Sequence, residues 1–248
     1  MEKTPVVLLP ALMCNAGLFL HQIQALKEEV DFFVPDLTLD TDIGSVAERV
    51  LREAPDYFAL AGISMGGYIA FEIMRRAPER VKRLALIDTS ALPDTEGARR
   101  KRMNMIETAR EAGMKNIIHS VLPNLVAPQH LDNDMVCRVL LYMAEKVGIQ
   151  GYINQQKIIM SRPDSFPLLP GITCPTLVFG GYQDKLTPPD LMKKIADAIP
   201  NAVHAVIADS GHMSPLENPA AVTAVMRAWL FGNRSETSAA KEHEAASA

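Results

Sequence analysis

The stretch Ala59-Leu60-Ala61-Gly62-Ile63-Ser64-Met65-Gly66-Gly67 joins two different patterns of side chains. The run that ends at Ile63 is continuously apolar, as in a buried strand of a parallel sheet. In residues 66–76, apolar side chains recur at helical spacing. A strand that turns directly into a helix through Gly-x-Ser-x-Gly is typical of a nucleophile elbow, which holds a serine at the tip of the turn.

Ser64 has the surroundings that an attacking hydroxyl group needs. The turn that exposes such a serine is strained and crowded, and glycine at Gly62 and Gly66 avoids the clash that a side chain would make. The helix that follows points its free N–H groups at the serine, where they can hold a negatively charged oxygen. Taken alone, the motif also fits a tight turn without chemistry. The flanking strand and helix favour the nucleophile.

The length and composition of the chain fit a globular protein with a large core. Its 248 residues suffice for one domain, or for one domain with an inserted subdomain, and 48% of them are hydrophobic. The net charge of −4 and the lack of a basic stripe argue against a nucleic-acid partner. Cys14, Cys137 and Cys174 have no metal-ligand spacing and favour a reducing compartment. No apolar run approaches the roughly 18 residues that span a bilayer, and no targeting segment is recognisable. We therefore expect a cytoplasmic protein without a membrane partner, as a monomer or a homodimer.

Apolar runs and helical patterns alternate along much of the chain. The predicted strands cover residues 5–9, 31–37, 57–63, 84–88, 176–179 and 202–208. The predicted helices between and after them cover residues 17–29, 43–53, 66–76, 189–199 and 219–230. Such alternation predicts an α/β fold: an open, parallel, six-stranded sheet flanked by helices and joined by right-handed crossovers.

The alternation stops between residues 89 and 170. Only helical patterns appear there, at residues 99–112, 114–122, 134–147 and 149–160. We therefore expect residues 91–170 to form a helical lid, inserted into a core made of residues 1–90 and 171–231. Residues 232–248 are small and polar and are predicted to be a disordered tail.

Two later loops carry the residues that could activate Ser64. A serine nucleophile needs a base that takes its proton and an acid that orients the base. Asp184 follows the strand at residues 176–179, and His212 follows the strand at residues 202–208. Each has an alternative role, since Asp184 could cap the next helix and His212 could be a buried structural histidine. Asp88 also ends a strand and competes with Asp184 for the role of the acid.

Three stretches together resemble the α/β-hydrolase fold superfamily over nearly the whole chain. They are Gly62-Ile63-Ser64-Met65-Gly66-Gly67, Gly181-Tyr182-Gln183-Asp184-Lys185-Leu186-Thr187-Pro188 and Ser210-Gly211-His212-Met213-Ser214-Pro215-Leu216-Glu217-Asn218-Pro219. Their order and their places after strands match the serine, acid and histidine of that superfamily. The chain is most similar to lidded carboxylesterases and 3-oxoadipate enol-lactonase-like hydrolases. This resemblance implies hydrolysis of carboxylic esters or lactones without a cofactor, and strands in the spatial order 2-1-3-4-5-6.

The resemblance also implies an oxyanion hole. Its donors would be the backbone N–H groups of Met65 and Leu12. The chain differs from many members of the family in two further features. Many relatives have His-Gly after the first parallel strand, where this chain has Pro10-Ala11. The antiparallel hairpin that opens the sheet in many relatives is expected to be missing.

These features lead to a functional hypothesis. Ser64 would attack a small or medium apolar ester or lactone, and water would hydrolyse the acyl-enzyme. The methionine-rich lid would line the acyl pocket, and Met143 and Ile153 are its predicted substrate contacts. No metal is expected, because no ligand cluster is visible. The alternatives are a small-ligand receptor that keeps the triad, a carbon–carbon bond hydrolase and a thioesterase.

Overall fold

The computed structural model describes residues 3–232. Its centre is a sheet of six strands: β1 (Thr4–Leu9), β2 (Val30–Phe33), β3 (Phe58–Ile63), β4 (Val81–Ile87), β5 (Thr176–Gly181) and β6 (Val203–Ile207). They lie in the order β2-β1-β3-β4-β5-β6, and every neighbouring pair is parallel. The predicted open parallel sheet and its strand order are confirmed.

Burial along the strands follows their place in the sheet. All residues of β3 and β5 are buried, whereas Val203 and Val206 of the edge strand β6 are exposed. The other edge strand, β2, ends at Phe33 and is shorter than the predicted 31–37. Proline explains the early end, because Pro35 has no N–H group to donate and restricts the backbone of the residue before it.

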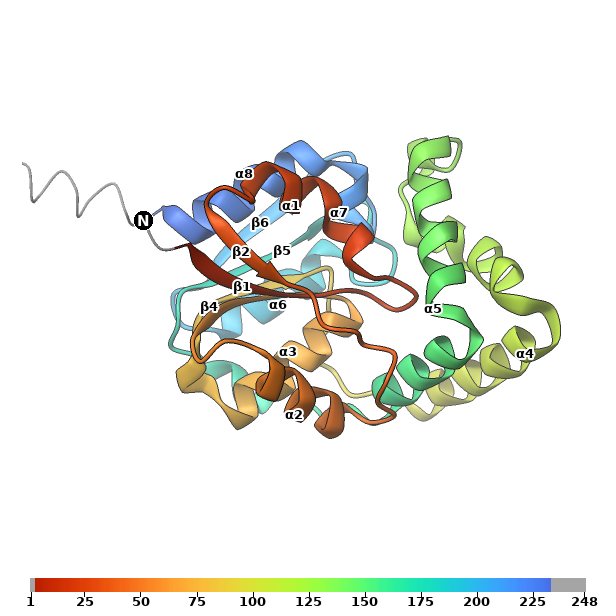
Figure 1. Ribbon diagram of the computed structural model, residues 1–248, viewed down its shortest axis with the longest axis horizontal. Coiled ribbons are helices and arrows are strands. Elements are labelled where there is room, and N and C mark those ends of the chain that lie inside the picture. The colour runs from red at the N-terminus through yellow and green to blue at the C-terminus, as the bar shows by residue number, and fades with distance from the viewer. Residues whose placement is uncertain (1–2, 233–248) are drawn as a thin grey trace, which may run out of the picture.

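Helices cover both faces of the sheet (Figure 1). One face carries α2 (Ile43–Glu53), α3 (Met65–Arg76) and α6 (Pro189–Ala198), and the other carries α1 (Leu20–Leu26) and α8 (Pro219–Phe231). Strand β1 serves both sides, since Val7 and Leu9 pack with the first group and Val6 and Leu8 with the second. This two-sided burial explains why the central strands read as continuous apolar runs.

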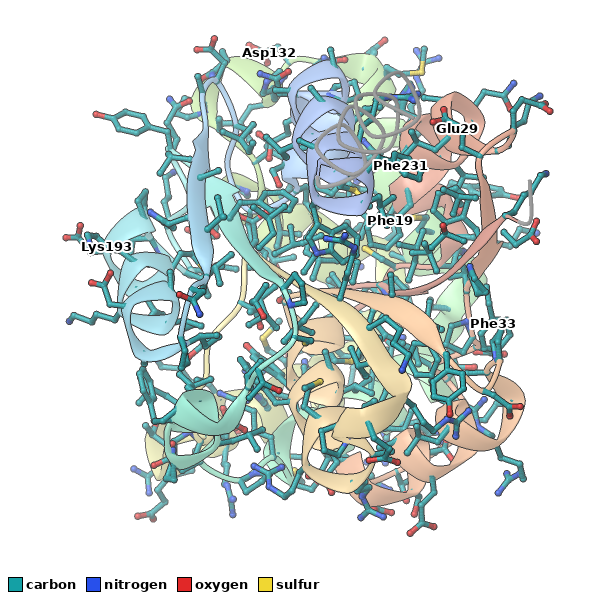
Figure 2. The ribbon with its side chains drawn as sticks, turned by 90° about the vertical axis from the view of Figure 1, so that its left-hand side faces the viewer. Phe19, Glu29, Phe33, Asp132, Lys193 and Phe231 are labelled. Atoms are coloured by element: carbon teal, nitrogen blue, oxygen red, sulfur yellow. The ribbon has the colours of Figure 1, made fainter. Side chains whose placement is uncertain are left out.

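Figure 2 shows the same layers from the side. Phe19 lies in the interior near α8 and is fully buried, whereas Lys193 points outward from α6. The predicted helix at residues 17–29 starts as a 3-10 turn, and its α-helical part ends at Leu26. The remaining short helices are η1 (Ala16–Phe19), η2 (Pro78–Arg80), η3 (Pro128–His130), η4 (Phe166–Gly171) and α7 (Ser214–Glu217).

Two long helices follow β4 and stand together outside the layers of the sheet (Figure 1). These are α4 (Glu96–Leu125) and α5 (Asp134–Met160), which we call the lid. Each bends at a glycine with positive φ, Gly113 at 79° and Gly148 at 68°. The four helical patterns seen in the sequence are therefore the halves of two bent helices. The predicted tail at 232–248 lies outside the described residues, except for Gly232.

No helix within residues 3–232 is both long enough and apolar enough to cross a membrane.

Candidate active site

Ser64 stands at the sharp turn between β3 and α3, with φ of 52° and ψ of −114°. This backbone region is strained for any residue with a side chain. The turn is also crowded: a Cβ atom on Gly62 would lie 2.4 Å from the carbonyl oxygen of Gly66, and one on Gly66 would lie 1.9 Å from that of Leu9. Glycine at both positions is therefore a steric requirement of the elbow.

The structure brings the three residues from distant loops into one hydrogen-bonded chain. Nε2 of His212 lies 2.8 Å from Oγ of Ser64, and Nδ1 lies 2.8 Å from Oδ2 of Asp184. Asp184 follows β5 and His212 follows β6, so both stand at the carboxyl edge of the parallel sheet. Both side chains are buried, so water does not compete for these hydrogen bonds.

The carboxylate of Asp184 is held in its charged form. Burial alone would raise its pKa, but the nearby His212 and hydrogen bonds from His212 and Thr187 outweigh it and lower the pKa to about 2. Oδ1 accepts the N–H groups of Leu186 (2.7 Å) and Thr187 (3.1 Å), and Oδ2 accepts the Thr187 hydroxyl at 2.5 Å. These bonds fix the carboxylate toward the imidazole ring. Asp184 does not cap the helix that follows, because the N-cap of α6 is Pro188, and Oδ2 of Asp184 is bonded to His212.

Asp88, the competing acid, lies next to this chain without joining it. It is fully buried, and its carboxyl group accepts the N–H of Gly181 at 2.7 Å and the hydroxyl of Ser214 at 2.5 Å. Burial and the charge of Asp184 raise the pKa of Asp88 well above the usual value.

Oxygen and nitrogen atoms of Asp88, Asp184 and His212 lie within 4.8 Å of one another, a spacing that could hold a metal ion. The hydrogen bonds above already engage these atoms: Asp184 with His212, and Asp88 with Gly181 and Ser214.

The two expected oxyanion donors lie in the loop after β1 and directly after Ser64 in the chain. Leu12 lines the cavity beside Ser64, and Met65 begins α3, where first-turn N–H groups have no partner within the helix. The loop that carries Leu12 is anchored from the lid, because the N–H of Met13 donates to Oε1 of Gln155 at 2.9 Å. Gln155 is fully buried on α5. Sequence reasoning missed it, although a glutamine on an otherwise apolar helix face was a usable signal.

A buried glutamate holds the loop on both sides of His212. Glu217 accepts the N–H groups of Gly211 and Met213, each at 3.0 Å, and that of Ala127 at 2.7 Å. The N–H of His212 itself donates to the carbonyl of Leu125 at 3.0 Å. Burial raises the pKa of Glu217 in spite of these bonds. The histidine loop is thus tied to the end of α4, a link that the sequence did not reveal.

Ser64 and His212 open into a cavity of about 650 Å³ between the core and the lid. Its apolar lining from the lid side includes Leu92, Met105, Val121 and Ile159. Polar groups also line it: Asp94, Arg102, Gln156 and Arg162. The size is typical of a small-molecule site. The lining is more polar than the expectation of a purely apolar acyl pocket.

The two predicted lid contacts do not line this cavity. Met143 is fully buried, and its sulfur packs against Gly17 of η1, 3.2 Å from where a Cβ atom on that glycine would lie. Ile153 is also buried, at 5% exposure. Only the end of α5 reaches the cavity, through Gln156 and Ile159, so the buried side chains earlier on this helix serve packing. The assignment of Met143 and Ile153 as pocket residues is corrected accordingly.

Comparison with known proteins agrees with the fold. Residues 6–225 match the alpha/beta hydrolase family. Among solved structures, the chain is similar to a thermophilic esterase from Thermogutta terrifontis with malate bound, at 30% identity and a TM-score of 0.88, covering 93% of this chain and 90% of that one. An enol-lactonase from Burkholderia xenovorans LB400 shares the fold at 23% identity and a TM-score of 0.81, covering 93% and 92%.

A curated relative that is similar in sequence has a name from another class of enzyme. The chain is 29% identical over 181 residues to the putative non-heme bromoperoxidase BpoC of Mycobacterium tuberculosis. The match covers 67% of this chain and 65% of that relative, so it spans about two thirds of the relative's own length.

Proposed function

The chain belongs to the alpha/beta hydrolase family, and on that basis we propose that it is a serine hydrolase of carboxylic esters or lactones. The carrying observation is the unbroken chain from Asp184 through His212 to Ser64, which ends at the wall of a cavity large enough for a small molecule. Esterases and an enol-lactonase among the similar structures support the same reaction class.

The reaction proceeds in two steps that use the same groups. Oγ of Ser64 attacks the carbonyl carbon while Nε2 of His212 takes its proton, and Asp184 stabilises the imidazolium that forms. The N–H groups of Leu12 and Met65 hold the oxyanion. The imidazolium then gives its proton to the leaving alcohol. In the second step, His212 removes a proton from water, which attacks the acyl-enzyme. As the bond from the carbonyl carbon to Oγ of Ser64 breaks, the imidazolium returns its proton to Oγ, and the acid is released.

The test is the Ser64→Ala variant on p-nitrophenyl acetate. Loss of the nucleophile should lower kcat on the order of 10⁴- to 10⁶-fold without unfolding the protein. Ser90→Ala is the matched control, because Ser90 lines the same cavity but bonds to Leu92 rather than to His212. More than about a tenth of wild-type activity in Ser64→Ala would contradict the assignment. A single slow turnover in the wild type would favour a ligand receptor instead.

A further inference from the structure

The cavity has a charged wall, built by three side chains from separate parts of the lid region. Asp94 precedes α4, Arg102 lies on its second turn, and Arg162 follows α5. Oδ2 of Asp94 is 3.1 Å from Nε of Arg102, and Oδ1 is 3.0 Å from Nη1 of Arg162. The side chains are 1%, 22% and 10% exposed, respectively. The group therefore lies inside the protein rather than on its surface.

The charges of this wall do not balance. One carboxylate faces two guanidinium groups, and the other partners are neutral. Arg102 also donates to Oε1 of the fully buried Gln156 at 3.0 Å, and Arg162 donates to the carbonyls of Leu92 and Ile159. Among residues 3–232, the hydrogen bonds of these two arginines come from Nε and Nη1, and none comes from Nη2. One carboxylate balances only one of the two positive charges, and an anion in the cavity would balance the other.

The pKa of Arg162 points the same way. Burial lowers it from the usual value, even though Tyr68 and Asp94 act to raise it. The contacts within the protein therefore compensate the burial of this cation only in part.

The wall lies within reach of Ser64. The guanidinium group of Arg162 stacks over the ring of Tyr68, 4.3 Å from its centre. Tyr68 is one helical turn beyond Ser64 on α3, and its N–H donates to the carbonyl oxygen of Ser64 at 3.3 Å. One turn advances about 5.4 Å along a helix. Ser64, Tyr68, Arg102 and Arg162 also line one cavity, so a substrate in it can contact both the arginines and Ser64.

We propose, building on the ester hydrolase function above, that Arg102 and Arg162 bind a carboxylate of the substrate. The preferred substrates would then be half-acid esters, or lactones that carry a free carboxylate, rather than neutral esters. Guanidinium groups suit this ligand because their paired N–H groups match the two carboxylate oxygens. The apolar residues of the cavity, such as Met105 and Val121, would contact the carbon chain in between.

The first experiment compares two esters of equal acyl length, mono-p-nitrophenyl glutarate and p-nitrophenyl valerate. The wild type should have the higher kcat/KM on the charged ester. Arg102→Gln and Arg162→Gln should each lower the ratio of charged to neutral by roughly 10- to 100-fold, the range of a charge-assisted hydrogen bond. Asp94→Asn should raise that ratio, because it removes the competing carboxylate. A purely structural role would not give opposite signs for the arginines and the aspartate.

Arg100→Gln is the matched control. Arg100 lies on the same helix, is exposed and pairs with Glu96 outside the cavity, so its loss should leave the ratio unchanged. A wild type that favours the neutral ester both in this pair and in the pair described next, or arginine variants that keep the wild-type ratio, would overturn the proposal. In a second pair, 4-acetoxybenzoate and 4-methylphenyl acetate, the first member carries a negative charge on its leaving group and the second is neutral. Preference for the charged member in either pair supports carboxylate binding and shows on which side of the ester it occurs.

A binding measurement on an inactive variant tests the carboxylate site independently of ester hydrolysis. Ser64→Ala protein should bind glutarate in calorimetry, and adding Arg102→Gln or Arg162→Gln should weaken the affinity by roughly tenfold or more. If no ester is hydrolysed but glutarate binds through the arginines, the hydrolase function fails while the carboxylate site stands. If esters are hydrolysed but glutarate does not bind, the reverse holds.

Discussion

Two buried aspartates lie side by side at this site, and their hydrogen bonds assign them different tasks. Asp184 bonds to the ring of His212, whereas Asp88 bonds to the backbone of Gly181 and the hydroxyl of Ser214. Asp88 therefore connects the loop that carries Asp184 with the loop that carries His212. Its contacts support the loop geometry without touching the imidazole.

The two asparagine variants should separate these tasks. Asp184→Asn should lower kcat on the order of 10³- to 10⁴-fold, because His212 loses both its orientation and the charge that stabilises its cation. Asp88→Asn should lower kcat much less and should mainly reduce stability. Steady-state kinetics with circular dichroism as a folding control measures both effects. A folded Asp88→Asn protein with the larger loss of kcat would make Asp88 the acid.

The low pKa of Asp184 also predicts how stability depends on pH. Its folded value of about 2 lies below the usual 3.8, so the folded state favours the charged form. The resulting stability is complete above the unfolded pKa and is lost as the pH falls through about 2. Between about pH 5 and pH 2, the wild type should lose on the order of 2 kcal/mol more than Asp184→Asn. Urea unfolding across this range tests it, with the exposed Asp190→Asn as control. Parallel curves for wild type and Asp184→Asn would contradict it.

At the scale of elements, the short helix α7 joins the histidine loop to the lid. Its last residue, Glu217, accepts N–H groups from Gly211, Met213 and Ala127. The first two flank His212, and the third follows the end of α4. One carboxylate therefore sets the position of the histidine backbone relative to the lid.

Glu217→Gln tests this link with little change in volume. The amide keeps one oxygen, but its NH₂ group cannot accept a backbone N–H, so at least one buried donor loses its partner. We expect a loss of about 1–3 kcal/mol in the free energy of unfolding, together with a lower kcat and a smaller change in KM. The exposed Glu48→Gln is the control. An unchanged kcat in the less stable variant would show that Glu217 supports the lid without positioning His212.

For the whole molecule, the sequence predicted what is encoded locally. The elbow at Ser64 and the loops of Asp184 and His212 each follow a recognisable strand, and parallel topology brings strand ends to one edge. The glycines that bend the lid helices also showed up as breaks in the helical patterns.

The remaining features depend on contacts between segments far apart in the chain. Asp94, Arg102 and Arg162 meet only when the ends of α4 and α5 come together, and no local pattern marks them as one group. The packing role of Met143 and Ile153 was also hidden in the sequence. A lid helix is apolar both on the face that packs against the core and on the face that lines a pocket. Sequence periodicity identifies a buried face but does not say what it is buried against.

The lid therefore contains apolar side chains of two kinds, and substitutions should distinguish them. Val121 and Met105 line the cavity, so Val121→Phe and Met105→Ala should change the ratio of kcat/KM between p-nitrophenyl hexanoate and p-nitrophenyl acetate. The larger side chain should disfavour the long acyl group, and the smaller one should favour it.

Met143→Ala should leave that ratio unchanged and should instead lower the free energy of unfolding by about 2–5 kcal/mol, because it opens a void against η1. Thermal unfolding and the two esters measure both effects. If Met143→Ala shifts the ratio while Val121→Phe does not, the acyl group binds on the far side of α5, and the cavity described here is not the substrate site.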